Sequence, residues 1–162
     1  METKINLLFV DDEDKFLEAM TKRLEARDFN VVAVNRGEKA IEAARNTPID
    51  LALVDLKMPG IDGETTLKAL KQEHKWMEIV ILTGHGSIDS AVECTKTGAY
   101  SYLQKPCDLD QLMDVLREAY QKRVMNKTKI EKERMTKMLE VVQSSSVKDI
   151  LRRLKEIDAG KI

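Results

Sequence analysis

Apolar positions along the first 120 residues recur with two different spacings, one typical of strands and one typical of helices. Short, largely apolar runs rich in Leu, Ile and Val predict strands at 5–10, 30–34, 50–55, 78–82 and 99–103. Between them, apolar residues three or four positions apart predict helices at 14–27, between Gly37 and Pro48, at 62–74, at 87–97 and from Asp108 onward. We expect Leu67 and Leu70 to face inward, and Ile88 and Val92 to share one side of their helix.

Strands that alternate with helices are joined by crossover connections, which predicts a mostly parallel sheet with helices on both faces. The expected fold class is α/β, a flavodoxin-like doubly wound five-stranded parallel sheet of order 2-1-3-4-5 with a C-terminal helical extension. The switch point of this order lies between strands one and three. Asp11, Asp12 and Asp55 would then lie together at the edge where ligands bind in such folds.

Three carboxylates in one pocket repel one another, by about 4 kcal/mol for a pair about 4 Å apart at an effective dielectric constant near 20. Protonation of one acid or a bound cation can relieve this repulsion, and hard oxygen ligands that leave several waters in place suit Mg²⁺. Thr83 and Lys105 end the fourth and fifth expected strands and add a hydroxyl and an ammonium to the same edge as the three acids. An acid nucleophile, a metal, a hydroxyl and an ammonium form a set suited to making an aspartyl phosphate on Asp55.

Four motifs in this order resemble the receiver domain of two-component response regulators. They read LFVDDE, LVDLKMPGIDG, ILTGHGS and YLQKP, and the resemblance covers residues 4 to about 121. The LTGHGS form is similar to receivers of nitrogen-regulation and nitrogen-fixation regulators. The resemblance implies a phosphorylation-dependent switch that accepts a phosphoryl group from a sensor histidine kinase or phosphotransfer protein. Such a receiver is not a dedicated enzyme, but it catalyses its own phosphorylation and slow dephosphorylation.

By this resemblance Asp55 is the phosphoacceptor. The metal ligands would be Asp11, Asp12, Asp55 and the backbone carbonyl of Lys57. Lys105 would pair with the phosphoryl group, and the peptide bond that follows it would be cis.

The resemblance also assigns a switch pair and two positions that influence phosphoryl lifetime. Thr83 and Tyr102 match the switch pair, in which the hydroxyl moves toward the phosphate and the aromatic ring turns inward. Lys57 lies two residues after the phosphoacceptor, and His85 lies two residues after the switch threonine. Both are expected to influence water access and therefore the hydrolysis rate.

The C-terminal residues differ in charge from the rest. Residues 1–119 carry a net charge of −7, whereas residues 120–162 carry +6, which predicts a boundary near residue 120. We expect a receiver domain at 1–121 and a helical extension at 122–162 that serves dimerisation or links to an output.

Good helix formers without Gly or Pro fill residues 121–142, although the polar stretch 126–134 is also compatible with a flexible segment. Two apolar stripes are separated by serines at 144–146. They consist of Met135, Met138, Leu139 and Val142, and of Val147, Ile150, Leu151, Leu154 and Ile157. About 40 residues bury too little apolar surface to fold alone, so the stripes should pack on each other, on the receiver or on a second copy. A homodimer is expected, through the extension or through the face of the fourth and fifth helices.

Composition limits the remaining classes of function. Hydrophobic residues make up 43% and charged residues 34%, and the apolar runs are too short to span a bilayer. Cys94 and Cys107 match neither a disulfide framework nor a metal-ligand spacing, which favours a cytoplasmic protein. The basic extension lacks a DNA-reading motif, so nucleic acid is not an expected partner. Because the apolar runs are short, a membrane is not an expected partner either.

Three alternatives to the switch remain. A phosphatase of the aspartyl-phosphate type needs a second aspartate two residues after the nucleophile, where this chain has Lys57. A flavin carrier needs a Ser/Thr/Gly-rich phosphate loop after the first strand, where Asp11, Asp12 and Glu13 would repel the anion. A scaffold that keeps the receiver fold without phosphotransfer is compatible with the sequence.

Overall fold

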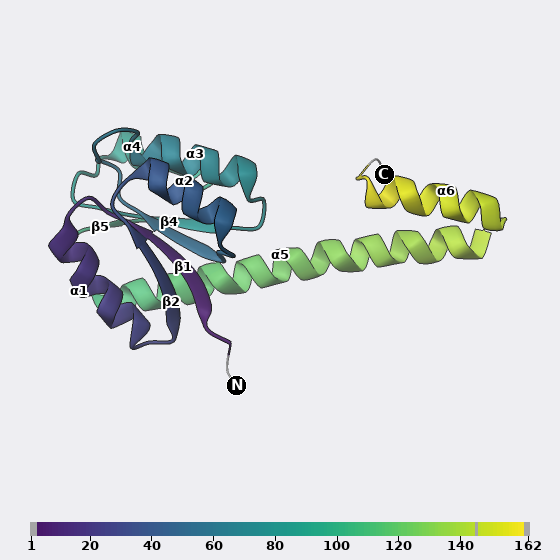
Figure 1. The fold of residues 1–162 in the computed structure, drawn as a ribbon, viewed down its shortest axis with the longest axis horizontal. Coiled ribbons are helices and arrows are strands. Elements are labelled where there is room, and N and C mark those ends of the chain that lie inside the picture. Colours follow the sequence, from purple (N-terminus) through teal and green to yellow (C-terminus); the bar gives the residue numbers. More distant parts are fainter. Residues whose placement is uncertain (1–2, 145, 161–162) are drawn as a thin grey trace. The chain divides into compact units, whose positions relative to one another are not determined.

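A five-stranded parallel sheet forms the centre of the N-terminal part of the molecule (Figure 1). The computed structural model describes residues 3–144 and 146–160. The strand order is β2-β1-β3-β4-β5, which confirms the predicted topology. The strands are β1 (Ile5–Val10), β2 (Phe29–Val34), β3 (Leu51–Val54), β4 (Glu78–Thr83) and β5 (Ser101–Gln104). β3 and β4 are buried along their whole length, as expected for strands covered on both faces.

Helices cover both faces of this sheet (Figure 1). The helices of this part of the chain are α1 (Asp14–Glu25), α2 (Gly37–Asn46), α3 (Gly63–Glu73), α4 (Ile88–Thr97) and the first half of α5 (Leu109–Ser144). A further helix, α6 (Val147–Asp158), follows α5 in the C-terminal part of the chain. Alternate residues of a strand point to opposite faces, so β1 places Leu7 and Phe9 in the core with α1 and α5, and Leu8 and Val10 in the core with α2 and α3. These two cores hold the strand ends in fixed positions.

Local signals set several of the helix ends. Asp62 caps α3 by accepting a hydrogen bond from the Thr65 N–H at 2.8 Å, and Ser146 caps α6 by accepting from the Asp149 N–H at 3.4 Å. Gly98 ends α4 with a φ of +114°, a left-handed conformation that glycine adopts without strain.

The helices α3 and α4 differ in how their apolar residues are buried. Leu67 and Leu70 of α3 are fully buried, as predicted. The apolar side of α4 instead faces outward, since Ile88 is 84% and Val92 46% exposed, while Cys94 is the buried residue of this helix. The strand that follows α4 begins at Ser101 and not at residue 99, because the Ala99 N–H still bonds to the Cys94 carbonyl at the end of the helix.

Ion pairs bind α5 to the edge of the sheet where β3 and β4 begin. Arg123 in α5 lies 3.4 Å from the carboxylate of Asp50, which also accepts a hydrogen bond from the Asn6 N–H at 2.9 Å. Lys122 lies 3.8 Å from Glu78, a buried carboxylate at the start of β4. These contacts fix the part of α5 that packs on the sheet.

The chain divides into two compact units, Met1–Arg123 and Val124–Ile162. α5 continues through the boundary to Ser144, so the polar stretch 126–134 is helical. The break predicted at the three serines includes Ser145, which lies outside the described residues. Within the described part of the chain, no helix is both long and apolar enough to cross a membrane.

The second unit covers its apolar residues only in part. Val141 of α5 and Ile157 of α6 are buried, and Arg134 of α5 pairs with Asp158 of α6. Five apolar residues of the two predicted stripes are exposed to solvent. They are Met135, Leu139, Val142, Val147 and Leu151.

Candidate functional site

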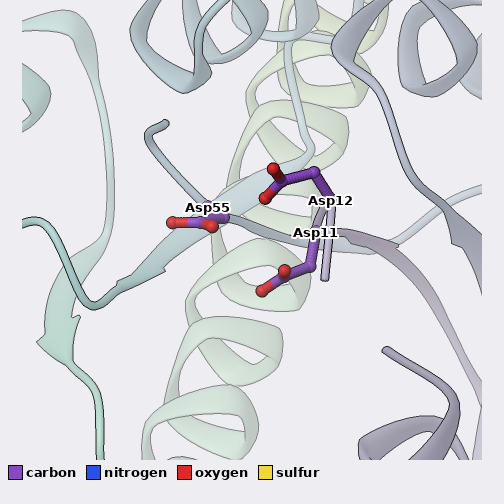
Figure 2. Close-up of side chains that lie close together, drawn as sticks. All are labelled: Asp11, Asp12 and Asp55. Atoms are coloured by element: carbon purple, nitrogen blue, oxygen red, sulfur yellow. The ribbon is translucent and has the colours of Figure 1, made fainter. Parts of the chain in front are cut away.

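Two neighbouring strands bring the acidic residues together. Val10 of β1 is in register with Val54 of β3, so the residues that follow them, Asp11 and Asp55, leave the sheet side by side. The Asp55 N–H bonds to the Val10 carbonyl at 3.0 Å and extends the strand pairing by one step. Asp11 is 1% and Asp55 2% exposed, while Asp12 is exposed to solvent. One carboxylate oxygen from each of the three acids lies within 4.8 Å of the others (Figure 2).

Lys105 provides a cation beside the two buried acids. Its Nζ donates to Asp11 Oδ2 at 2.6 Å and lies 3.8 Å from Asp55 Oδ2. The ammonium also lies 4.1 Å from the centre of the Phe16 ring, a cation–π contact that helps to hold it. Lys105 directly follows β5, and its peptide bond to Pro106 is cis, as the resemblance implied.

Burial and charge act in opposite directions on the Asp11–Lys105 pair. Burial raises the pKa of the Asp11 carboxyl above its usual range, although the hydrogen bond from Lys105 opposes this. For Lys105, burial alone would lower the pKa, but the hydrogen bond to Asp11 and the charges of Asp11, Asp55 and Glu13 outweigh it and raise the pKa. The ammonium therefore stays charged at neutral pH.

Backbone donors fix the orientation of the two buried carboxylates. The Leu56 N–H donates to Asp55 Oδ1 at 2.8 Å, and the Glu13 N–H donates to Asp11 Oδ1 at 2.9 Å. The Oδ2 atoms of both acids pair with Lys105. The carboxylates are therefore oriented before any ligand binds, which reduces the ordering that a reaction at this site requires.

This donor set suits a magnesium ion. Asp11, Asp12 and Asp55 contribute three carboxylates, and Lys105 offsets only part of their charge. Carboxylate oxygens beside solvent match the preference of Mg²⁺ for a few acidic ligands completed by water. Such an acidic cluster is typical of the Mg²⁺ site of receivers.

An open hollow lies beside the acidic cluster. Its volume is about 530 Å³, and it is lined by Asp12, Glu13, Lys57, Met58, Pro59, Asp62 and His85. The structure thus places Lys57 and His85 in the lining of one hollow, although they follow different strands. Asp12, the exposed member of the cluster, belongs to the same lining.

Thr83 and Tyr102 lie on neighbouring strands of the sheet. Thr83 is the last residue of β4 and is fully buried, and its Oγ1 accepts a hydrogen bond from the His85 N–H at 3.1 Å. Tyr102 in β5 is half-buried, and its hydroxyl lies 2.8 Å from the hydroxyl of Ser90 in α4. The sequence alone does not single out Ser90, whose only signal is a spacing from Ser87 that favours a helix cap.

A glycine is required at position 63, where α3 begins close to the backbone that follows β3. A Cβ placed on Gly63 would lie 2.2 Å from the Asp55 carbonyl oxygen and 2.6 Å from the Leu56 Cα. Because both neighbours are backbone atoms, no side-chain rotation relieves such a clash. The close approach of α3 to the end of β3 therefore depends on the missing side chain.

Comparisons with known proteins agree with this geometry. The response regulator receiver domain family matches residues 7–117. The chain is 37% identical over 115 residues to the transcriptional regulatory protein ZraR of Escherichia coli K12, and 32% identical over 110 residues to the DNA-binding transcriptional regulator NtrC of the same organism. These alignments cover 71% and 68% of this chain but 26% and 24% of the relatives. The chain thus spans about a quarter of the length of these two relatives.

Solved structures show the same fold. A response regulator receiver domain from Clostridium thermocellum superposes with a TM-score of 0.71 at 29% identity, covering 75% of this chain and 98% of that one. The beryllofluoride-activated NtrC4 receiver domain dimer gives a TM-score of 0.69 at 25% identity and covers 73% of this chain and 98% of that one. With its sheet order, its acidic cluster and these relatives, the chain belongs to the receiver domain family of two-component response regulators, related to regulators of the NtrC and ZraR type.

Proposed function

We propose that this receiver is a phosphorylation-dependent switch that takes a phosphoryl group onto Asp55 from the phosphohistidine of a sensor kinase or phosphotransfer protein. The observation that carries the proposal is the cluster of Asp11, Asp12 and Asp55 with Lys105 beside the two buried acids. A purely structural role explains this cluster poorly, because the cluster concentrates like charges without full neutralisation.

In the transfer step an oxygen of Asp55 forms a bond to phosphorus while the bond between phosphorus and the imidazole nitrogen of the donor breaks. The electron pair of that bond leaves with the imidazole. The Leu56 N–H holds the Asp55 carboxylate in one orientation. Lys105 would pair with the transferred phosphoryl group, and the Thr83 hydroxyl would donate to one of its oxygens.

Asp11, Asp12, Asp55 and the backbone carbonyl of Lys57 would hold Mg²⁺. When bound, the ion supplies positive charge that offsets the carboxylates and the incoming phosphoryl oxygens. Backbone hydrogen bonds already orient Asp11 and Asp55, whereas the Asp12 side chain is exposed.

Phosphorylation adds nearly two negative charges at the end of β3. It would favour one of two pre-existing arrangements, since a ligand shifts an equilibrium only by its differential affinity. Thr83 and Tyr102 would pass the change to an output surface on α4, β5 and α5. The exposed Ile88 and Val92 supply apolar area on that surface.

We further propose that Lys57 and His85 set the lifetime of the phosphoryl group. Both line the hollow beside the acids, where water would approach. Replacing each with alanine should change the half-life of the phosphorylated protein, measured after removal of the donor. Half-lives equal to that of the wild type would discard this role.

The assignment of 1–121 as receiver and 122–162 as a dimerisation or signalling extension is supported by the division of the chain after Arg123. We propose a homodimer through the extension or through the face of α4 and α5; the similar NtrC4 receiver is described as a dimer. Light scattering with and without beryllofluoride tests this, and Leu139→Lys in the extension and Val92→Lys on α4 decide which face is used. A sensor kinase partner would require a cytoplasmic receiver.

The central experiment is incubation with acetyl phosphate and Mg²⁺, followed by mass spectrometry. The wild type should gain one acid-stable, base-labile phosphoryl group, and Asp55→Asn should gain none. Fast multiple turnover would indicate a hydrolase, and an unlabelled wild type would favour a scaffold.

A further inference from the structure

The loop between β4 and α4 is held at both ends by side-chain hydroxyls. At its start the Thr83 Oγ1 accepts from the His85 N–H at 3.1 Å. At its end Ser87 and Ser90 form a reciprocal cap, in which the Ser90 N–H donates to Ser87 Oγ and the Ser87 N–H donates to Ser90 Oγ, each at 3.0 Å. The loop is thereby tied to the acidic edge on one side and to α4 on the other.

Ser90 also contacts Tyr102 through a hydrogen bond between their hydroxyl groups, whose oxygens are 2.8 Å apart. Ser90 Oγ lies 3.1 Å from Ser87 Oγ and 3.0 Å from the Ser87 carbonyl oxygen as well, so either hydroxyl can be the donor in the bond to Tyr102. This bond links β5 to the first turn of α4.

The missing side chain at Gly86 leaves room for the ring of Tyr102. A Cβ on Gly86 would lie 2.6 Å from the Tyr102 hydroxyl oxygen and 3.2 Å from the ring carbon Cε1. The ring therefore rests against bare backbone of the loop, with its hydroxyl turned to Ser90. A side chain at position 86 would displace the phenol from the Ser90 hydroxyl.

The contacts around Asp55 indicate which arrangement this hydrogen bond belongs to. Lys105 Nζ donates to Asp11 at 2.6 Å and is 3.8 Å from Asp55, and Thr83 Oγ1 is held to the loop by accepting from the His85 N–H. To contact a phosphoryl group on Asp55, Lys105 would move from Asp11, and Thr83 would move away from the loop. The hydrogen bond between the serine of α4 and the tyrosine of β5 is therefore part of the arrangement that precedes phosphorylation.

We propose that Ser90 is a positioning residue that holds Tyr102 in the resting arrangement and so sets how readily the receiver is switched. The inference rests on the proposed phosphorylation of Asp55 and adds to that function a contact, between Ser90 and Tyr102, that opposes switching. Losing one net hydrogen bond from the resting arrangement shifts the equilibrium between the resting and the activated arrangement by about three- to tenfold. An activating ligand gains apparent affinity by the same factor while the resting state predominates.

The test measures the dissociation constant of beryllofluoride with Mg²⁺ for the full chain. Ser90→Ala and Tyr102→Phe should each bind about three- to tenfold more tightly than the wild type, and the double variant should bind no more tightly than either. Ser90→Thr keeps the hydroxyl and should restore wild-type affinity. Ser87→Ala is the matched control, because it removes the contacts of Ser87 Oγ with the Ser90 N–H and Ser90 Oγ but leaves both hydroxyls of the Ser90–Tyr102 bond in place.

A second readout compares the ligand-free variants with the beryllofluoride-bound wild type. In Ser90→Ala and in Gly86→Ala, the ring resonances of Tyr102 should move from their resting position toward the position they take in the beryllofluoride-bound wild type. Unchanged or weaker affinity in Ser90→Ala, or additive effects in the double variant, would overturn the role of Ser90. Failure of the wild type to bind beryllofluoride or to be phosphorylated would instead overturn the proposed function.

Discussion

Replacing Asp55 with asparagine should stabilise the fold in the absence of metal, although it removes the carboxylate that we propose as the phosphoacceptor. The substitution preserves the shape of the side chain and its oxygen Oδ1, which accepts a hydrogen bond from the Leu56 N–H. What it removes is a negative charge from a site that is 2% exposed. The variant therefore isolates the electrostatic contribution of the acid to stability.

The distances around Asp55 give the sign of the expected change in the free energy of unfolding. Its carboxylate and that of Asp11 have oxygens at most 4.8 Å apart, a repulsion of at least about 3.5 kcal/mol at an effective dielectric constant near 20. The 3.8 Å separation from Lys105 gives an attraction of about 4.4 kcal/mol on the same scale. These two contributions nearly cancel, which leaves the repulsion from Asp12 and the lost hydration uncompensated. We expect Asp55→Asn to raise the free energy of unfolding by about 1–3 kcal/mol.

The assay is urea unfolding followed by circular dichroism, in EDTA and in Mg²⁺. At about ten times its dissociation constant, Mg²⁺ should stabilise the wild type by about 1.4 kcal/mol. The variant lacks one of the carboxylates and should gain far less. The stability advantage of Asp55→Asn should therefore shrink or disappear when the metal is added.

Asp50→Asn is the matched control at the opposite end of β3. Asp50 is paired with Arg123 and accepts from the Asn6 N–H, so its charge is compensated. The control should lose about 1–2 kcal/mol of stability, equally with and without Mg²⁺. If Asp55→Asn is instead less stable than the wild type in EDTA, the electrostatic reasoning about the acidic cluster is wrong.

Three further predictions concern other parts of the chain. Gly63→Ala should lower the free energy of unfolding by about 1–3 kcal/mol in urea titrations, because its Cβ would meet backbone, while Gly84→Ala, whose Cβ would lie 3.9 Å from its nearest neighbour, should change it little. Burial raises the pKa of the Cys94 thiol to about 11, so at pH 8 only about one thiol in a thousand is ionised. Iodoacetamide should therefore label the half-exposed Cys107 first, and equal labelling of both in the native protein by mass spectrometry would contradict this. Ile157→Ala should lower the helical circular dichroism signal of the second unit without changing beryllofluoride affinity, since the side chain is buried within that unit.

Much of the acidic edge could be predicted from the sequence because its residues directly follow strands or end them. Asp11 and Asp55 follow buried runs, Thr83 ends one, and Lys105 comes after a shorter one. Alternation of strands and helices implies a parallel sheet, and parallel strands bring their carboxyl ends to one edge. Residues far apart in the chain could therefore be placed together without coordinates.

Other features depend on packing that periodicity does not describe. Spacing groups Ile88 with Val92 on one side of α4, but it does not tell whether that side faces the sheet, and here Cys94 is the residue that is buried. The contact between Ser90 and Tyr102 joins two elements through single side-chain orientations. No local pattern in the sequence encodes such a pair.

The structure of the C-terminal extension could also be predicted only in part from the sequence. Helix propensity left the polar stretch 126–134 open between a helix and a flexible segment, and the structure shows a helix. The apolar stripes predicted burial, yet among the described residues of the second unit only Val141 and Ile157 are buried, and Val141 belongs to neither stripe. Pairing between amphipathic helices depends on which partner is available, and one chain's sequence does not state this.

The acidic side chains at the two ends of β3 have different charge partners, and they lie far enough apart to be changed separately. Asp50, before the strand, is paired with Arg123, whereas Asp55, after it, shares the Lys105 ammonium with Asp11 and lies near a third acid, Asp12. Five residue steps of strand place them roughly 16 Å apart, where two unit charges interact by about 1 kcal/mol at an effective dielectric constant near 20, about a quarter of the value at 4 Å. Substitutions that adjust stability at the start of the strand should therefore change the electrostatics of the acidic cluster at its end only slightly.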